Sequence, residues 1–167
     1  PRPGEHQSVA TTVESAWRQQ LGPRPDGRLD GALDGIRVLD LSSFFATAYG
    51  AKLLADLGAD VIKIEPPVGD QLRPFPDPFE ACNRGKRSLA IDLRRPEGRA
   101  AIEALVATSD VVMHNLRPGK AEKLGLGPGQ LTAINSRLIY AYLPGFGSTG
   151  PRRDEKSFEP LLSGFTG

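Results

Sequence analysis

The stretch DGIRVLDLSSFFATAYGAKLLADLGADVIKIEPP, residues 34–67, predicts the fold. Short apolar runs at 36–41 and 61–64 have the length of buried strands. The sequence between them predicts a helix, because apolar residues recur there at three- and four-residue spacing, namely Phe45, Tyr49, Leu53, Leu54 and Leu57. Two apolar strands joined by such a helix indicate parallel strands with a right-handed crossover.

Ligands of open parallel sheets bind beyond the carboxyl ends of the strands, so residues 42–47 and 65–68 are the first candidate positions. The glycine fingerprint of dinucleotide-binding folds is missing after the first strand, where only Gly50 is present. Glu65 has the position of a ribose-binding acid. Because two prolines follow it directly, a plain carboxylate at a strand end is the favoured interpretation.

Further strands are predicted at 88–93, 110–115 and 138–143, and they alternate with helical segments. The helices are expected from Pro96 onward, around 118–124 and at 131–134. The segment 66–85 holds five prolines and is expected to be an irregular loop. This alternation predicts an α/β protein with an open, mostly parallel, doubly wound (Rossmann-like) sheet.

Residues 1–33 are expected to form an N-terminal extension to a domain at 34–167. One helical face within 9–21 is apolar and consists of Val9, Val13, Ala16, Trp17 and Leu21. A proline- and glycine-rich linker follows at 22–28. Such a segment either docks on the domain or belongs to a preceding one.

Composition excludes several classes of protein. A net charge of +1 and 39% hydrophobic residues describe an ordinary globular chain, with no nucleic-acid partner expected. No apolar run approaches a membrane span and the N-terminus lacks a signal pattern, so we expect no membrane association. The single cysteine, Cys82, fits a cytoplasmic location, and the shortage of Cys and His argues against a metal site.

Positive charge is concentrated between residues 84 and 99. Six basic residues face only Asp92 and Glu97 there, namely Arg84, Lys86, Arg87, Arg94, Arg95 and Arg99. Guanidinium groups bind phosphates in a bidentate manner, so this cluster indicates either an anion site or an ordinary solvated surface. His114, at a predicted strand end, is expected to be a hydrogen-bonded structural residue rather than a catalytic one.

Five blocks of sequence, in this order, resemble the family III CoA-transferases, also called the CaiB/BaiF family. They are LDGIRVLDLSSFFATAYGAKLLADLGADVIKIEPPVGD, NRGKRSLAIDLRRPEG, SDVVMHNLRPGKAEKLGLG, NSRLIYAYLPGFGSTGP and FEPLLSGFTG, and they cover residues 33–167. The family includes formyl-CoA transferase, carnitine CoA-transferase and the α-methylacyl-CoA racemases. Because its members are much longer, the chain is expected to be their N-terminal part, as a fragment, a subunit or a cropped domain.

The resemblance implies a set of coenzyme A contacts at three strand tips and two basic positions. On this sequence they are Phe45 and Ala46; Ile91, Asp92, Leu93 and Arg94; Asn115, Leu116 and Arg117; Lys123; and Lys156. The family's nucleophilic aspartate lies in a segment beyond FEPLLSGFTG, so no catalytic residue is expected here except Glu159 as a possible auxiliary. Neither a metal nor a redox cofactor is implied, and coenzyme A enters only as substrate.

The resemblance further implies transfer of CoA from an acyl-CoA to a carboxylic acid, through an acyl anhydride and an enzyme-bound CoA thioester. An interlocked dimer or a partner domain is expected. Racemization is disfavoured, because Phe158 stands where racemases carry a histidine and has no proton to move. A non-catalytic binding or assembly domain is the alternative, since Thr47-Ala48 and Pro66 depart from the family's usual Gly-Pro and arginine.

Overall fold

The computed structural model describes residues 31–167, so the predicted helix at 9–21 and the linker at 22–28 lie outside the described residues. The elements follow in the order β1 (Arg37–Asp40), α2 (Ala46–Asp56), β2 (Asp60–Glu65), α3 (Pro76–Asn83), β3 (Arg87–Ala90), α4 (Pro96–Ala107), β4 (Val111–His114), α5 (Lys120–Lys123), α6 (Pro128–Ile134), β5 (Ile139–Tyr142) and α7 (Glu159–Thr166). The strands form one parallel sheet in the order β3-β2-β1-β4-β5. This confirms the predicted doubly wound α/β sheet.

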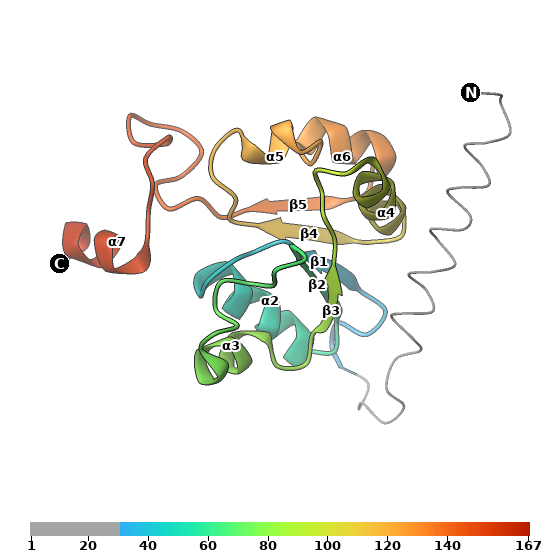
Figure 1. Ribbon diagram of the computed structural model, residues 1–167, viewed down its shortest axis with the longest axis horizontal. Helices are drawn as coiled ribbons and strands as arrows, with labels where there is room; N and C mark the ends of the chain where they lie inside the picture. Colours follow the sequence, from blue (N-terminus) through green and yellow to red (C-terminus); the bar gives the residue numbers. More distant parts are fainter. Residues whose placement is uncertain (1–30) are drawn as a thin grey trace, which may run out of the picture.

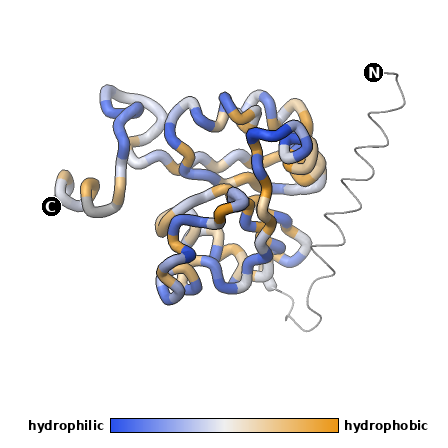
Figure 2. Tube along the Cα trace, viewed as in Figure 1, coloured by the Kyte–Doolittle hydropathy of each residue, from blue (hydrophilic) through white to orange (hydrophobic). Residues whose placement is uncertain are grey.

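Helices cover both faces of the sheet. Figure 1 shows α2 and α3 on one face and α4, α5 and α6 on the other, while α7 stands apart from these layers. Neighbouring residues of a strand serve opposite faces, so Val38 packs toward α2 and Leu39 packs toward α4. Apolar residues accordingly recur along the central strands in Figure 2. Within residues 31–167, no helix has the length and apolarity needed to cross a bilayer.

Helix α2 lies where the sequence predicts it, but its apolar row faces outward. Ala48, Ala51 and Ala55 are the residues buried against the sheet. Four of the five predicted apolar residues are about half exposed instead, with Phe45 at 48%, Tyr49 at 49%, Leu53 at 44% and Leu57 at 49%, whereas Leu54 packs against the core. Small side chains let the helix approach the strands closely, and larger ones would hold it away.

The proline-rich segment 66–85 contains a helix, so the prediction of an irregular loop is wrong there. Helix α3 begins at Pro76, and Pro78 lies within its first turn. The backbone N–H groups of a first turn have no intrahelical acceptor, so proline removes no hydrogen bond at these positions. The segment before α3 remains irregular, as predicted.

The strand order reverses at β1, which makes the gap between β1 and β4 the topological switch point. The chain leaves β1 through α2 on one face, whereas it leaves β4 through α5 and α6 on the other. The carboxyl ends of these two strands therefore carry loops that diverge to opposite sides. In open α/β sheets this divergence creates the usual ligand-binding position.

Candidate functional site

Asn115 joins the two strand tips at the switch point. Its side-chain Oδ1 accepts a hydrogen bond from the Ser43 backbone N–H at 3.0 Å, and its Nδ2 donates to the Ser43 carbonyl at 2.7 Å. Phe45 and Ala46 follow Ser43 into α2, while Leu116 and Arg117 follow Asn115 beyond β4. The structure thus brings together the residues predicted at the first and third strand tips.

The loop after β1 adopts an uncommon backbone conformation. Phe44 has a φ of +60°, in the left-handed region that non-glycine residues rarely occupy. Its ring meets the edge of Phe158 at a centroid distance of 5.8 Å, which connects this loop to the segment before α7. Thr47, at the start of α2, is fully buried, so its side chain points into the protein rather than toward the open edge.

We expect Asn115→Asp to lower the free energy of unfolding by about 1–2 kcal/mol at pH 7, because an unprotonated carboxylate cannot donate to the Ser43 carbonyl. Protonation of the new carboxyl restores a donor, so the deficit relative to the wild type should shrink at pH 4. Urea titrations at both pH values measure this difference. Asn115→Ala, which loses both hydrogen bonds, should show an equal deficit at both pH values. A pH-independent deficit for Asn115→Asp would contradict the two-bond arrangement.

Two of the six basic residues of the predicted cluster do not lie at the carboxyl edge of the sheet. One is buried inside the fold and the other lies at the amino edge. Lys86 is buried, and its Nζ donates to Asp40 Oδ2 at 2.7 Å, to the Ala48 carbonyl at 2.7 Å and to Asn83 Oδ1 at 2.9 Å. Burial lowers the pKa of Lys86, against the opposing effect of the Asp40 carboxylate. Arg87 pairs with Asp60 at the amino ends of the strands. The predicted basic cluster is therefore not one surface.

Glu65 is held by protein groups at the end of β2. Its carboxylate accepts two hydrogen bonds from Arg73, at 2.6 and 2.7 Å, one from the Ser88 hydroxyl and one from the Asp70 backbone N–H. Burial raises the pKa of Glu65, but these hydrogen bonds together outweigh it and the pKa is lowered. Glu65 is thus an internally satisfied strand-end carboxylate, the interpretation favoured from the sequence.

The segment 91–94 lies at the same edge of the sheet but beside β2 and β3 rather than beside Asn115. Ile91 is buried, and Leu93 packs against the core on the α4 side. Asp92 accepts hydrogen bonds from the Arg94 guanidinium at 2.8 and 2.9 Å, which lowers the pKa of Asp92 to about 2. The Arg94 side chain is 81% exposed, so it is open to solvent at this edge.

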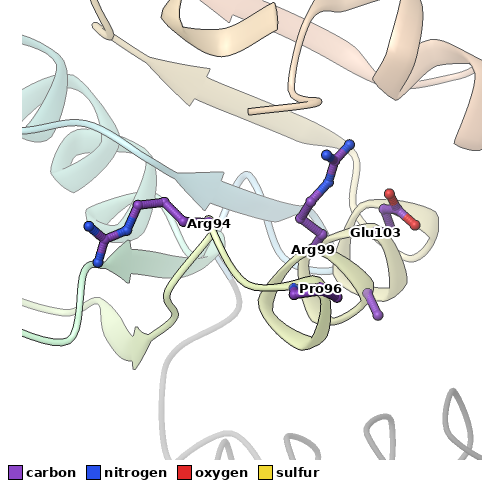
Figure 3. Close-up of a pocket in the computed structure, with 5 residues that line it drawn as sticks. Arg94, Pro96, Arg99 and Glu103 are labelled. Atoms are coloured by element: carbon purple, nitrogen blue, oxygen red, sulfur yellow. The ribbon is translucent and has the colours of Figure 1, made fainter. Parts of the chain in front are cut away.

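An open cavity of about 450 Å³ adjoins the start of α4. Its lining consists of Arg94, Pro96, Arg99, Ala100 and Glu103. Figure 3 shows Arg94 reaching away from α4, while Arg99 and Glu103 project from the helix. The Arg99 guanidinium lies so close to Gly125 that any Cβ there would collide with it, and Gly125 also has a φ of +76°. Sequence reasoning grouped Arg99 with the basic cluster but did not single it out.

The remaining predicted residues lie between β4 and the end of α5, and at the start of α7 or just before it. Arg117 and Lys123 are exposed after β4, and Lys156 is exposed in the segment before α7. Glu159 is the first residue of α7, but its side chain is not among those that the structure describes. Within residues 31–167, no group of three or more His, Cys, Asp or Glu side chains is arranged to hold a metal ion.

His114 is buried and hydrogen-bonded within the fold, as the sequence predicts. Its Nδ1 accepts the Leu116 backbone N–H at 3.2 Å, so the proton of the neutral ring is on Nε2. Nε2 lies 2.6 Å from the Tyr140 hydroxyl, which donates in turn to the Leu126 carbonyl at 3.0 Å. Burial lowers the pKa of His114 to about 4 and raises that of Tyr140 to about 12. Both side chains are therefore neutral near pH 7.

Comparisons of this chain with known sequences and with known structures point to the same protein family. The sequence model of CoA-transferase family III matches residues 33–167. Succinyl-CoA–D-citramalate CoA-transferase of Chloroflexus aurantiacus is 43% identical over 148 residues, covering 83% of this chain and 35% of that protein. Succinate–glutarate CoA-transferase of Agrobacterium fabrum is 40% identical over 150 residues, covering 81% and 38%. A CaiB/BaiF family protein of Brucella suis superposes with a TM-score of 0.79 at 40% identity, covering 82% and 39%.

Proposed function

Because the chain belongs to CoA-transferase family III, we propose that it supplies the coenzyme A-binding part of an enzyme that transfers CoA from an acyl-CoA to a carboxylic acid. The chain spans well under half the length of the relatives it matches. Two of those relatives are named succinyl-CoA–D-citramalate CoA-transferase and succinate–glutarate CoA-transferase, so dicarboxylic acids are the first acceptors to test.

One observation carries the proposal: Asn115 fixes the tips of β1 and β4 side by side at the switch point. This places the start of α2 next to the residues after β4, at the edge where open parallel sheets bind ligands. Ala46 has a small side chain and is exposed, so it leaves room for the pantetheine arm of coenzyme A.

The cavity at the start of α4 is a second observation that supports the proposal. It lies at the same carboxyl edge and combines Arg94 with Arg99. Within residues 31–167, the Arg99 guanidinium has neither an ion pair nor a hydrogen bond, so it is available to an anion. A phosphate group, which coenzyme A carries on its nucleotide end, is an anion that a guanidinium group binds well. Figure 3 shows Arg94 pointing away from Arg99, and Asp92 already accepts two hydrogen bonds from Arg94, so the two arginines do not form one pair here.

Phe158 favours transfer of CoA over racemization. Its ring packs edge-on against Phe44 and is 51% exposed, close to the loop after β1. A hydrocarbon ring can shape a binding site but cannot exchange a proton with the carbon next to a thioester. The proposed role of this position is therefore packing.

Calorimetric titration of the 167-residue chain with coenzyme A tests the proposal. We expect binding, and we expect Arg94→Ala to weaken it about tenfold through loss of a charge-assisted hydrogen bond. Arg137→Ala is the matched control, because Arg137 is an exposed arginine that precedes β5 at the amino edge of the sheet. Its variant should bind like the wild type.

Two results would contradict the proposal. Absence of binding at millimolar coenzyme A would favour the non-catalytic assembly role instead. Equal losses for Arg94→Ala and Arg137→Ala would show that attraction by the overall charge, and not a site at the carboxyl edge, holds the ligand. Repeating the titration at higher salt distinguishes attraction by the overall charge from binding at a site, because salt screens the non-specific attraction.

A further inference from the structure

Lys63 is buried in β2 and has partners in two separate loops. Its side chain is 1% exposed. Its Nζ donates a hydrogen bond to the Ser42 carbonyl at 3.0 Å and forms an ion pair with Asp70 Oδ2 at 2.9 Å. Ser42 follows β1, whereas Asp70 follows β2, so one ammonium group joins the segments that leave two neighbouring strands at their carboxyl ends.

The β2 loop, residues 66–75, depends on Asp70 for its attachment to the sheet. Asp70 Oδ1 accepts a hydrogen bond from the Leu72 backbone N–H at 2.7 Å, and the Asp70 N–H donates to Glu65 at 2.9 Å. Arg73 completes the attachment through the two hydrogen bonds to Glu65 given above. Asp70 thus fixes the loop internally with one carboxylate oxygen and joins it to the buried ammonium group with the other.

The β1 loop, residues 41–45, is held by side chains from three parts of the sheet. The Ser42 N–H donates to Asp40 Oδ1 at 2.9 Å, and the Ser42 carbonyl accepts from the ammonium group of β2. Both backbone polar groups of Ser43 bind the Asn115 side chain. Groups from β1, from β2 and from the tip of β4 therefore fix the backbone of two successive residues.

This attachment accounts for the strained residue that comes next in the β1 loop. Phe44 has the left-handed φ of +60°, which a bulky residue keeps only where the surrounding structure imposes it. Phe45 and Ala46, two of the expected contacts with coenzyme A, follow it directly. The hydrogen bonds of the β1 loop thus set the direction in which these two residues leave the strand.

We propose that Lys63 is a positioning residue of the coenzyme A site, because it couples the β1 loop to the β2 loop at the carboxyl edge of the sheet. The inference rests on the proposed function for its effect on coenzyme A, whereas the coupling rests on contacts within the protein alone. When the β2 loop moves away, the buried ammonium group loses the carboxylate that neutralises its charge, which is unfavourable in the interior. The two loops are therefore expected to open together.

Amide hydrogen exchange followed by NMR measures this coupling without any ligand. The N–H groups of Ser42 and Ser43 report on the β1 loop, and those of Asp70 and Leu72 report on the β2 loop, since each donates to a side chain. Arg73→Gln weakens an attachment of the β2 loop only. We expect this variant to accelerate the exchange of all four amides by the same factor, about tenfold.

Arg87→Gln is the matched control for this experiment. Arg87 also binds a buried carboxylate, that of Asp60, but at the amino edge of the sheet. The control variant should leave the Ser42 and Ser43 amides at the wild-type exchange rate. Acceleration of the β2 loop amides alone by Arg73→Gln would overturn the coupling.

Lys63→Met shows whether the coupling passes through Lys63. In this background, Arg73→Gln should still accelerate the Asp70 and Leu72 amides but should have no further effect on those of the β1 loop. Where Lys63→Met does not fold, Asp70→Asn breaks the same link and keeps an acceptor for the Leu72 N–H. Transmission to the β1 loop that survives the loss of this link would overturn the role of Lys63.

Coenzyme A tests the consequence for the site. At about ten times its dissociation constant it should slow the exchange of the β1 loop amides about tenfold, and through Lys63 it should slow those of Asp70 and Leu72 by a similar factor. In Lys63→Met only the β1 loop should be protected. Protection confined to the β1 loop in the wild type would overturn the positioning role. Absence of coenzyme A binding would instead refute the proposed function, and the exchange rates without ligand would still decide the coupling.

Discussion

Lys86→Met is expected to lower the free energy of unfolding by about 3–5 kcal/mol. Asp40 and Lys86 have side chains that are 0% and 1% exposed, so removing the ammonium group leaves a carboxylate buried without a counter-ion. The Ala48 carbonyl and Asn83 Oδ1 lose their donor in the same step. Urea unfolding followed by circular dichroism measures the change, which is a large part of the stability of a typical domain.

Replacing Asp40 as well should recover part of this lost stability, because the buried carboxylate without a counter-ion is then removed. In the double variant Asp40→Asn/Lys86→Met neither member of this pair carries a charge, so its destabilisation should be smaller than the sum of the two single variants. Arg94→Met is the control, because it breaks an ion pair with Asp92 at the exposed edge and should change stability little. Additive losses in the double variant would argue against a direct interaction of Lys86 with Asp40.

Periodicity predicted where α2 lies but not which side of it is buried. The spacing of Leu53 and Leu57 is typical of an apolar helix face, and the sequence offers no second row of large residues to compare with it. The buried row consists of alanines and Thr47, which hydropathy ranks below leucine. Which row faces the sheet depends on how closely helix and strands approach, and that is a property of the assembled fold.

The proline-rich segment shows a different limit. Counting prolines between 66 and 85 excludes a helix interior, yet Pro76 and Pro78 occupy the first turn of α3, where proline is tolerated. The prediction failed because it used the number of prolines without their spacing. The residues that follow, from Phe79 to Asn83, contain no proline and complete the helix.

The sequence predicted that the candidate site lies at the carboxyl edge of the sheet. It did not predict the contacts that hold the strand ends together at this edge. Alternating strands and helices were enough to predict where the strand ends would gather. The pairing of Asn115 with Ser43 joins residues 72 positions apart, and it exists only because β4 is the neighbour of β1. The burial of Lys86 likewise depends on the tertiary arrangement, since its partner Asp40 lies 46 positions away.

Acidification should destabilise the protein through His114 before most carboxylates titrate. The folded pKa of His114 is about 4 and its unfolded value is near 6.5, so between these pH values the unfolded chain binds a proton that the folded chain does not. Stability is fully present above pH 6.5 and is lost as the pH falls toward 4. The difference amounts to about 3 kcal/mol from this residue alone.

His114→Gln should remove most of this dependence, because glutamine does not titrate. Unfolding free energies measured at pH 7, 6 and 5 should fall steeply for the wild type and stay nearly level for the variant. His6→Gln alters the chain's other histidine and should retain the wild-type slope.

The geometry explains why protonation is so costly. It would place a charge in a site that is 3% exposed and would turn Nδ1 into a donor facing the Leu116 N–H. The Tyr140 hydroxyl already accepts a hydrogen bond from Nε2 and donates one to the Leu126 carbonyl. It therefore provides no acceptor for the second ring proton, which would be on Nδ1. Equal slopes for wild type and His114→Gln between pH 5 and 6.5 would mean that this hydrogen-bonded chain opens at little cost.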